Sequence, residues 1–332
     1  MRAWVIHGFH GYKGLSLEEF EAKKPGPGEA RLRVEAFALN WGDMNLMRDM
    51  YSFSLREFPA LVGIEAAGIV DAVGEGIEDI EIGRRYCTLP YFYYNHGMSA
   101  ESAIVDARYI TPAPDGLSAV ESASIWMQYM TAYFPIVEIS KAAPGVNVLV
   151  PAATSTAGSA AVEFARMEGA SVIATSRFAY NSDFLNRLGA NHVFVDDGSD
   201  LTEFLIEATD GVGIHAAFDP IGAGMIQRYS RALAKNAWIF FYGFLDGNFP
   251  DLPFKDMFQA NAALKPYSLC NYVEDREMCE KGKAYVYDAI AAGKIAPRID
   301  RVYRMEDYRD AWEYVRTPRT RHGKVVIKTG VK

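Results

Sequence analysis

The sequence predicts an α/β protein that combines a barrel-like domain with a doubly wound parallel sheet. Short apolar segments separated by Gly and Pro fill residues 1 to about 125, a pattern typical of barrel strands. From about residue 126, strand-like and helix-like runs alternate, which indicates βαβ units with right-handed crossovers. We therefore expect a first domain over 1–125, a parallel-sheet domain over 126–265, and a return to the first domain over 266–332.

Each expected element has its own pattern of apolar residues. In the first domain, strands are expected at 30–39, 65–74 and 101–110. In the second domain, the expected strands are 146–150, 170–175, 192–195, 214–219 and 237–243, and the expected helices are 156–169, 181–189, 201–209 and 225–235. The last segment is irregular, with one expected helix over 280–293 and a terminal strand over 323–329.

Composition limits the class of protein. The chain has 332 residues, half of them apolar and 23% charged, which is globular composition with material for two domains. A net charge of -8 argues against a broad nucleic-acid face, and the basic run 316–324 is interpreted as solvated surface. No apolar stretch approaches membrane-spanning length, and three scattered cysteines form no disulfide framework. We expect a cytoplasmic protein without nucleic-acid or membrane partners.

The segment from Val150 to Arg166 has the outline of a nucleotide-binding turn between a strand and a helix. Such a turn needs small residues at three places, and Ala153, Ser155 and Gly158 have that spacing. The helix N-terminus that follows attracts phosphate. Only one of the three is glycine, so an ordinary strand-to-helix turn is the alternative. The candidate cofactor contacts here are Ala153, Thr154, Ser155, Thr156, Ala157 and Gly158.

The end of the next expected strand indicates which dinucleotide is bound. NAD sites place an acidic residue there for the ribose hydroxyls, whereas a 2'-phosphate calls for a cation. No acid occurs from Ile173 to Asn181, and Arg177 with Ser176 stands where the phosphate would lie. The prediction is NADPH, and the alternative is that Arg177 is a solvated loop cation.

Nearly the whole chain resembles the medium-chain dehydrogenase/reductase superfamily, in particular its zinc-independent quinone oxidoreductase branch. The resemblance rests on the order and spacing of several motifs. These are "EAFALNWGDMNLMRDMY", "FPALVGIEAAGIVDAVGEGI", "MTAYFPI", "NVLVPAATSTAG", "NRLGANHVF", "AAFDPIGAG" and "HGKVVIK". It implies a GroES-like β-barrel catalytic domain into which a Rossmann domain is inserted, and the family habit implies a homodimer.

The chain departs from the zinc-dependent relatives at both positions that would hold a catalytic metal. Ile64 stands where they carry histidine, and Asn40 lies near the place of their cysteine. Neither side chain is a good zinc ligand. The cysteine-rich lobe for structural zinc is also missing, and His96 is an isolated histidine. No metal is therefore expected.

A metal-free site favours acceptors that delocalise the incoming charge themselves, such as quinones, enones and enoyl thioesters. The resemblance implies that Asn40 faces the nicotinamide and that Thr131 holds its carboxamide. It also implies that Tyr51 lies near the substrate, as proton donor or oxyanion partner, with a packing aromatic at the cleft edge as the alternative. Phe53, Tyr91, Phe92, Tyr93 and Tyr94 either wall the substrate cleft or belong to the core. Further cofactor contacts are expected from Ser176, Tyr180, Tyr242, Gly243 and Phe244.

The resulting hypothesis is an NADPH-dependent reductase of quinones or other activated alkenes. An enoyl-thioester reductase is the alternative within the same class of reaction. A non-catalytic NADPH-binding sensor or structural protein is the alternative from another class. The joint presence of Asn40, Tyr51 and Thr131 argues against the non-catalytic protein.

Overall fold

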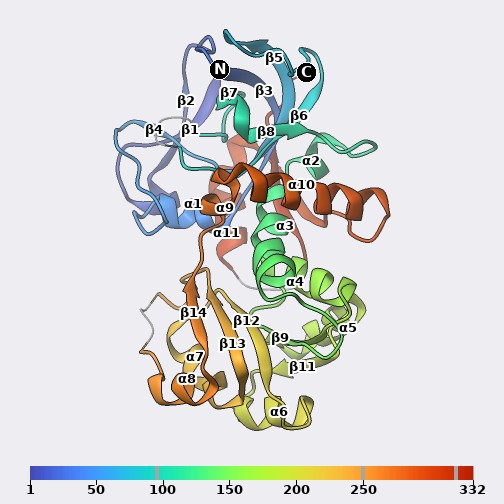
Figure 1. Cartoon of the computed structure of the whole chain (residues 1–332). Coiled ribbons are helices and arrows are strands. Elements are labelled where there is room, and N and C mark those ends of the chain that lie inside the picture. Colours follow the sequence, from blue (N-terminus) through green and yellow to red (C-terminus); the bar gives the residue numbers. More distant parts are fainter. Residues whose placement is uncertain (94–96, 248–250, 318–320, 332) are drawn as a thin grey trace. The chain divides into compact units, whose positions relative to one another are not determined.

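The chain folds into two compact units, and each has its own sheet and helices (Figure 1). The first unit comprises Met1–Met127 and Leu269–Lys332, and the second unit comprises Gln128–Ser268. The second unit is therefore an insertion within the first. The computed structural model describes residues 1–93, 97–247, 251–317 and 321–331.

The first unit is built on two sheets. One has three strands in the order β2-β1-β4, and the other has the order β15-β16-β3-β5-β6-β8, with β7 also paired to β3. The strands are β1 (Arg2–Ile6), β2 (Leu15–Glu19), β3 (Glu29–Ala38), β4 (Ala60–Leu61), β5 (Ala66–Val73), β6 (Arg85–Thr88), β7 (Ser102–Asp106), β8 (Ile110–Pro112), β15 (Ile299–Arg304) and β16 (Lys324–Lys328). Burial along β3 alternates and then becomes continuous, which turns one face toward the core.

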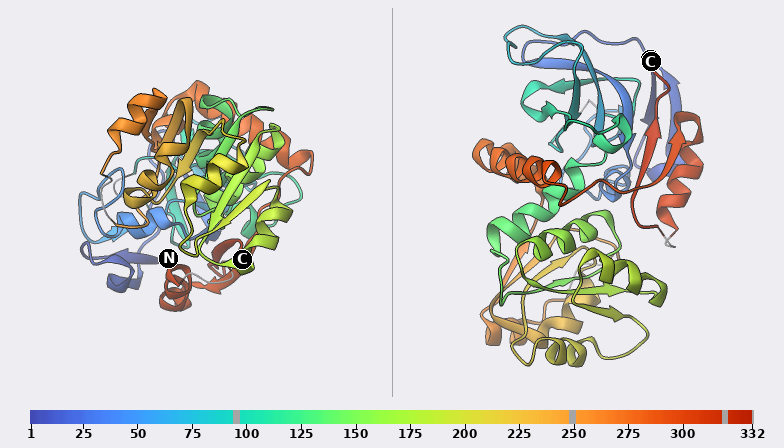
Figure 2. Two further views of the ribbon diagram at one scale, coloured as in Figure 1. Left: turned by 90° about the horizontal axis from the view of Figure 1, so that it is seen from below. Right: turned by 90° about the vertical axis from the view of Figure 1, so that its right-hand side faces the viewer.

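Helices of the first unit come from both of its segments. They are α1 (Trp41–Leu46), α2 (Ala119–Ser122), α9 (Leu269–Glu274), α10 (Arg276–Ala291) and α11 (Tyr308–Arg316). The second segment also completes the larger sheet, because β16 pairs antiparallel with β3, with Val326 opposite Ala38. In Figure 2 the red C-terminal strands accordingly belong to the same body as the blue N-terminal ones. No helix of the described chain is long and apolar enough to cross a bilayer.

The second unit is a doubly wound parallel sheet. Its six strands follow the order β11-β10-β9-β12-β13-β14, with helices on both faces (Figure 2). The order reverses between β9 and β12, and ligands of such sheets bind outside the carboxyl ends of the strands at this point. The strands are β9 (Asn147–Val150), β10 (Ser171–Ser176), β11 (His192–Val195), β12 (Ile214–Asp219), β13 (Leu233–Phe241) and β14 (Ala263–Pro266). The helices are α4 (Thr156–Met167), α5 (Ser182–Leu188), α6 (Leu201–Ala208), α7 (Ala223–Tyr229) and α8 (Phe254–Ala260). The helix α3 (Trp126–Tyr133) begins in the first unit and ends in the second.

The expected fold class is confirmed, with two kinds of local difference. The helix expected over 225–235 ends at Tyr229, and Leu233 already begins β13 because it pairs with Ile214 of β12. Sheet pairing there overrides the helical propensity of the segment. Several elements have no counterpart among the expected ones, among them α3, α8, α9, α11, β14 and β15.

The turn between β9 and α4 depends on close contact between helix and strand. Ser155 caps α4 by accepting a hydrogen bond from the Gly158 backbone N–H at 3.1 Å. A Cβ on Gly158 would lie 2.8 Å from the Ala152 carbonyl oxygen and 3.0 Å from the Ala153 Cα. Gly158 therefore lets the helix start close to the strand, which is the role of the third small residue in a dinucleotide turn.

Gly158→Ala should lower the free energy of unfolding by about 1–3 kcal/mol, because the added methyl group forces the turn apart. Thermal or urea unfolding without ligand measures this. Gly224→Ala is the matched control, since Gly224 is also helical and a Cβ added there would meet nothing within 4 Å. That variant should gain up to about 1 kcal/mol from helix propensity. Equal stability changes in the two variants would contradict the close contact at Gly158.

Candidate functional site

A buried polar cluster in the first unit joins segments that are far apart in the sequence. The Lys324 ammonium on β16 donates to the Glu65 carboxylate, Nζ to Oε2, at 2.9 Å, and it also donates to the Asn40 Oδ1. The side chains of Lys324 and Glu65 are 1% and 0% exposed. The backbone N–H of Met127 donates to the other Glu65 oxygen at 2.9 Å. Both charges are thus paired and hydrogen-bonded, as buried charges must be.

These bonds fix the orientation of the Asn40 amide. Its oxygen accepts from Lys324, while its Nδ2 donates to the Ala38 carbonyl at 3.3 Å and to Glu65 at 3.4 Å. Its backbone N–H donates to the Asp43 Oδ2 at 2.8 Å at the start of α1. Burial raises the pKa of Asp43 to about 7, although the hydrogen bond from Asn40 opposes the shift. The buried ammonium of Lys324 thus lies beside the Asn40 side chain and fixes its orientation.

Tyr51 lies against the same region. A Cβ on Gly42 would come within 3.0 Å of the Tyr51 Cε2 and 3.2 Å of the Ile64 Cδ1, so both side chains pack over this glycine. Burial raises the pKa of Tyr51 well above its ordinary value, with smaller contributions from Cys270 and Asp43. The phenol consequently stays protonated and able to donate at neutral pH.

The expected substrate-wall aromatics gather around Phe53. Its ring centroid lies 5.4 Å from Tyr51, 5.7 Å from Phe92 and 5.3 Å from Tyr93. Tyr91 stacks on Tyr109 at 4.4 Å. The structure therefore brings together the candidate residues Tyr51, Phe53, Tyr91, Phe92 and Tyr93, whereas Tyr94 and His96 lie outside the described residues.

The candidate cofactor residues of the second unit lie at one edge of the parallel sheet. The turn 151–155 follows β9, Ser176 ends β10, and Tyr242–Phe244 follow β13. Parallel strands bring these carboxyl ends to the same edge, beside the reversal of strand order. Thr131 belongs to α3 of this unit and is 7% exposed. The ring of Tyr242 stacks on Phe218 at 4.0 Å.

At the end of β10, Ser176 is buried and structural, whereas residues 177–180 that follow it are exposed. The Ser176 hydroxyl donates to the Phe178 carbonyl at 3.1 Å and accepts from the Asn181 Nδ2 at 2.9 Å, so it holds the turn. Arg177 and Tyr180 are exposed. Phe178 and Tyr180 stack at 5.1 Å with the Arg177 guanidinium carbon 5.6 Å from the Phe178 ring. The cation and the two rings form an exposed group at the strand end.

The structure adds site residues that the sequence did not single out. Lys324, Glu65 and Asp43 belong to the buried cluster, and the partners of Lys324 in its two bonds are 259 and 284 residues away along the chain. The only signal for Lys324 is its position in the closing motif "HGKVVIK", which predicts a strand and no partner. No group of three or more His, Cys, Asp or Glu side chains suited to a metal occurs among the described residues.

Replacing Lys324 with methionine should lower the free energy of unfolding by about 3–5 kcal/mol, because it leaves the Glu65 carboxylate buried without its cation. The double variant Lys324→Met/Glu65→Gln should recover much of this loss, since no unpaired charge remains. Urea unfolding of the wild type, both single variants and the double variant measures the coupling. Purely additive losses would contradict a direct energetic link between the two side chains.

Two family models match separate parts of the chain. The model described as "Alcohol dehydrogenase GroES-like domain" matches residues 26–115, and that described as "Zinc-binding dehydrogenase" matches residues 157–295. The second match lies outside positions 40 and 64, where the zinc-dependent relatives carry metal ligands. Its description therefore does not bear on the metal of this chain.

Known proteins resemble the chain over most of its length. It is 28% identical over 320 residues to 2-haloacrylate reductase from Burkholderia sp, covering 94% of this chain and 95% of that protein. It is 28% identical over 349 residues to the synaptic vesicle membrane protein VAT-1 homolog of Rattus norvegicus, covering 99% and 84%. The crystal structure of Escherichia coli quinone oxidoreductase complexed with NADPH has a TM-score of 0.90 at 23% identity, covering 99% and 100%.

The two family models, the insertion of a six-stranded parallel sheet into a barrel-like unit, and these relatives lead to one assignment. The chain belongs to the medium-chain dehydrogenase/reductase superfamily, in its zinc-independent branch.

Proposed function

We propose that the chain is an NADPH-dependent, zinc-independent reductase that transfers hydride to quinones or other conjugated alkenes. One observation carries the proposal: Tyr51 packs over Gly42 together with Ile64, the residue that stands where zinc-dependent relatives hold a metal ligand. Beside it, Asn40 is held by the ammonium of Lys324. The site therefore offers the Tyr51 hydroxyl as a hydrogen-bond donor where those relatives use a Lewis acid.

The second unit fits a bound dinucleotide phosphate. The turn after β9 has the close helix-strand contact at Gly158 that a pyrophosphate cradle requires. The helix α4 that follows presents its N-terminus to an anion. Exposed Arg177 at the end of β10 is suited to a 2'-phosphate, and the exposed rings of Phe178 and Tyr180 are suited to stacking on a base.

NADPH would supply the hydride, and the residues of the chain would orient the acceptor and supply a proton. Hydride addition to a conjugated carbon moves an electron pair onto the acceptor oxygen. Tyr51 Oη would donate its proton to that oxygen and regain one from solvent. Burial raises the pKa of Tyr51, so the phenol carries this proton at neutral pH. The aromatic rings around Phe53 would exclude water from the acceptor.

Lys324 is a positioning residue in this scheme. Because its ammonium bonds to the Asn40 oxygen, the Asn40 amide keeps its nitrogen on the opposite side. Thr131 is expected to bind the carboxamide of the cofactor, and Tyr242, Gly243 and Phe244 are expected to border it. No zinc is required for any of these steps.

Two alternatives have support from relatives. The VAT-1 homolog carries a name without an enzymatic activity, which keeps a non-catalytic NADPH-binding role as a candidate. Enoyl thioesters stay candidate acceptors, and a phenolphthiocerol/phthiocerol polyketide synthase subunit of Mycobacterium tuberculosis is 28% identical over 250 residues, covering 75% of this chain and 11% of that protein. We further propose a cytoplasmic homodimer. The terminal position of β14 in its sheet and the exposure of Phe258, 79%, support a second copy as partner.

Tyr51→Phe should keep the ring packed over Gly42 but delete the donor. The wild type should oxidise NADPH with quinones and enones, with chelators present or absent. The variant should lose roughly 100- to 10,000-fold in kcat toward enones. Quinones should lose less, because a reduced quinone oxygen can take its proton from water. Initial rates against a panel of quinones, enones and enoyl thioesters measure this.

Unchanged NADPH affinity and melting temperature in Tyr51→Phe serve as the controls for folding and cofactor binding. Native rates in the variant for every acceptor would show that Tyr51 is only part of the wall. No turnover by the wild type with any acceptor would favour the non-catalytic role, and loss of activity on chelation would contradict zinc independence.

Arg177→Ala should weaken NADPH binding by about 1.5–3 kcal/mol, or roughly 10- to 150-fold, because it removes a charged donor to the 2'-phosphate. NADH binding should hardly change. Arg187→Ala is the matched control, because Arg187 is an exposed cation on α5 of the same unit. Fluorescence titration with both cofactors measures the affinities. Equal affinity of the wild type for NADPH and NADH would contradict the assignment of Arg177.

A further inference from the structure

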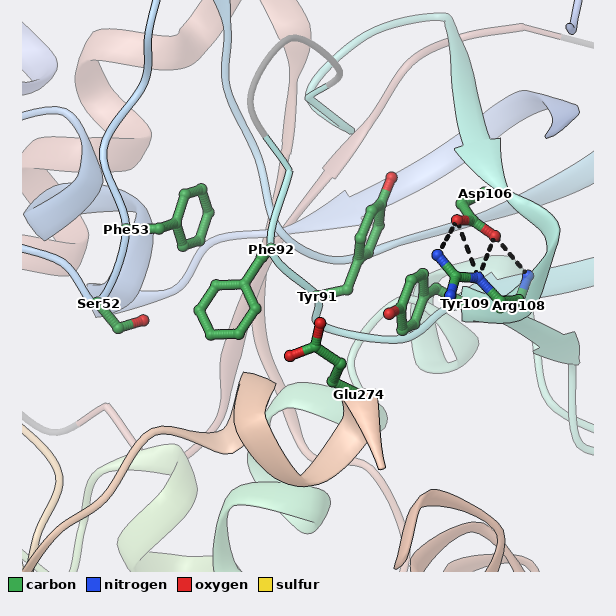
Figure 3. A pocket seen from close by; sticks show the side chains of 8 residues that line it. All are labelled: Ser52, Phe53, Tyr91, Phe92, Asp106, Arg108, Tyr109 and Glu274. Atoms are coloured by element: carbon green, nitrogen blue, oxygen red, sulfur yellow. Dashed lines mark hydrogen bonds and ion pairs between the residues drawn. The ribbon is translucent and has the colours of Figure 1, made fainter. Parts of the chain in front are cut away.

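A hollow of about 380 Å³ lies within the first unit, beside the ring cluster around Phe53 (Figure 3). Its described lining consists of four aromatic side chains, three charged ones and Ser52. The aromatic part includes Phe53, Tyr91 and Phe92, three of the residues expected to wall the substrate. Phe53 also contacts Tyr51 at 5.4 Å between ring centroids, which links the hollow to the proposed proton donor.

The aromatic part of the hollow suits a planar ring. Tyr91 and Tyr109 stack with an interplanar angle of 7°, and both are buried. Phe92 meets Phe53 edge to face at 5.7 Å. Flat ring faces and edges of this kind bind planar conjugated ligands by stacking and by apolar contact.

The charged part of the hollow contains one cation, and an acid neutralises it. Arg108 directs two guanidinium nitrogens at Asp106, with Nη2 2.6 Å and Nε 3.1 Å from Oδ2 (Figure 3). Its backbone N–H donates to the same carboxylate at 3.0 Å. The hydrogen bonds that the Arg108 guanidinium donates to Asp106 raise the pKa of Arg108, so this cation stays charged across the ordinary pH range. An anionic ligand would have to compete with Asp106 for this guanidinium.

Glu274, at the end of α9, supplies a second carboxylate. It is exposed, lines the hollow, and has no hydrogen bond or ion pair among the described residues. Two carboxylates and one guanidinium leave the described lining with a net charge of −1. The negative charge belongs to Glu274, because Arg108 and Asp106 cancel one another.

We propose that Glu274 is a specificity-determining residue that makes this hollow select neutral planar acceptors, such as an uncharged quinone ring, over acceptors that carry a carboxylate or sulfonate. This inference rests on the proposed function. It separates the chain from the similar 2-haloacrylate reductase, whose named substrate is an acrylate and therefore carries a carboxylate. The selection arises from repulsion of the wrong ligand and does not require a special contact with the right one.

The exposure of Glu274 limits how strongly its charge can discriminate between neutral and anionic acceptors. Two unit charges about 4 Å apart in water interact by about 1 kcal/mol, which corresponds to roughly fivefold in a rate or affinity ratio. Because Glu274 is exposed, salt should screen the effect over a Debye length of about 8 Å at 0.15 M. We therefore expect a discrimination that shrinks steeply with ionic strength.

The test compares 1,4-naphthoquinone with its 2-sulfonate, two acceptors that share a ring system and differ in charge. Glu274→Gln should raise kcat/KM for the sulfonate relative to the parent quinone by about three- to tenfold at low salt. This change in the ratio of kcat/KM values should vanish near 1 M salt, where the Debye length falls to about 3 Å. Glu78→Gln is the matched control, since Glu78 is exposed in the same unit, does not line the hollow and gives the same change in net charge.

Binding of two unreactive analogues, 2-naphthamide and 2-naphthoate, measured by calorimetry, gives a second readout that needs no turnover. A relative gain for the carboxylate in Glu274→Gln alone supports the proposal. An unchanged ratio in that variant, or the same change in Glu78→Gln, overturns it. Failure of every acceptor to be reduced, together with the expected binding shift, would reject the proposed reductase activity while leaving the charge selection intact.

Discussion

The buried pair of Lys324 and Glu65 is the constraint on which the first unit depends. Lys324 comes from the last strand, Glu65 from the segment before β5, and their common partner Asn40 from the N-cap of α1, just after β3. A charge in so dry an environment is tolerated only when it is fully paired. The pair therefore fixes the register of β16 against β3 and, through Asn40, the start of α1. Tyr51 and Ile64 then pack over Gly42 in that helix.

This arrangement gives a physical account of a medium-chain reductase without metal ligands at positions 40 and 64. In the zinc-dependent relatives a metal fixes the geometry of the site and carries positive charge. Here the Lys324 side chain supplies a positive charge at a fixed position, and this charge is paired inside the protein with Glu65 and hydrogen-bonded to Asn40. It can orient Asn40, yet it is too deeply buried to polarise an acceptor directly. That difference agrees with acceptors whose own conjugation stabilises the incoming charge.

The sequence predicted the alternation of strands and helices in the second unit because each apolar run there is continuous and bounded by small or polar residues. The prediction of a helix over 225–235 was wrong at its end, because Leu233 pairs with Ile214 in the sheet and this long-range contact is not visible in the local sequence. The sequence could have revealed α11, where buried Ala311, Trp312 and Val315 follow helical spacing. The resemblance points to Tyr51, whereas the sequence leaves Phe53 and Tyr93 open between substrate wall and core, and the structure places Phe53 beside both Tyr51 and Tyr93. The partners of Lys324 could not be predicted, because no local pattern relates residues so far apart in the chain.

The contact between Tyr51 and Gly42 has a consequence for the range of acceptors. Within the described residues the Tyr51 ring is held by packing, and no hydrogen bond fixes the direction of its O–H bond. A phenol held in this way can rotate its hydroxyl hydrogen toward oxygens at different positions around the ring edge. Under the proposed function, one proton donor could then serve acceptors of unequal size and shape. Breadth of substrate use would depend on the missing side chain of Gly42, a residue that itself takes no part in the chemistry.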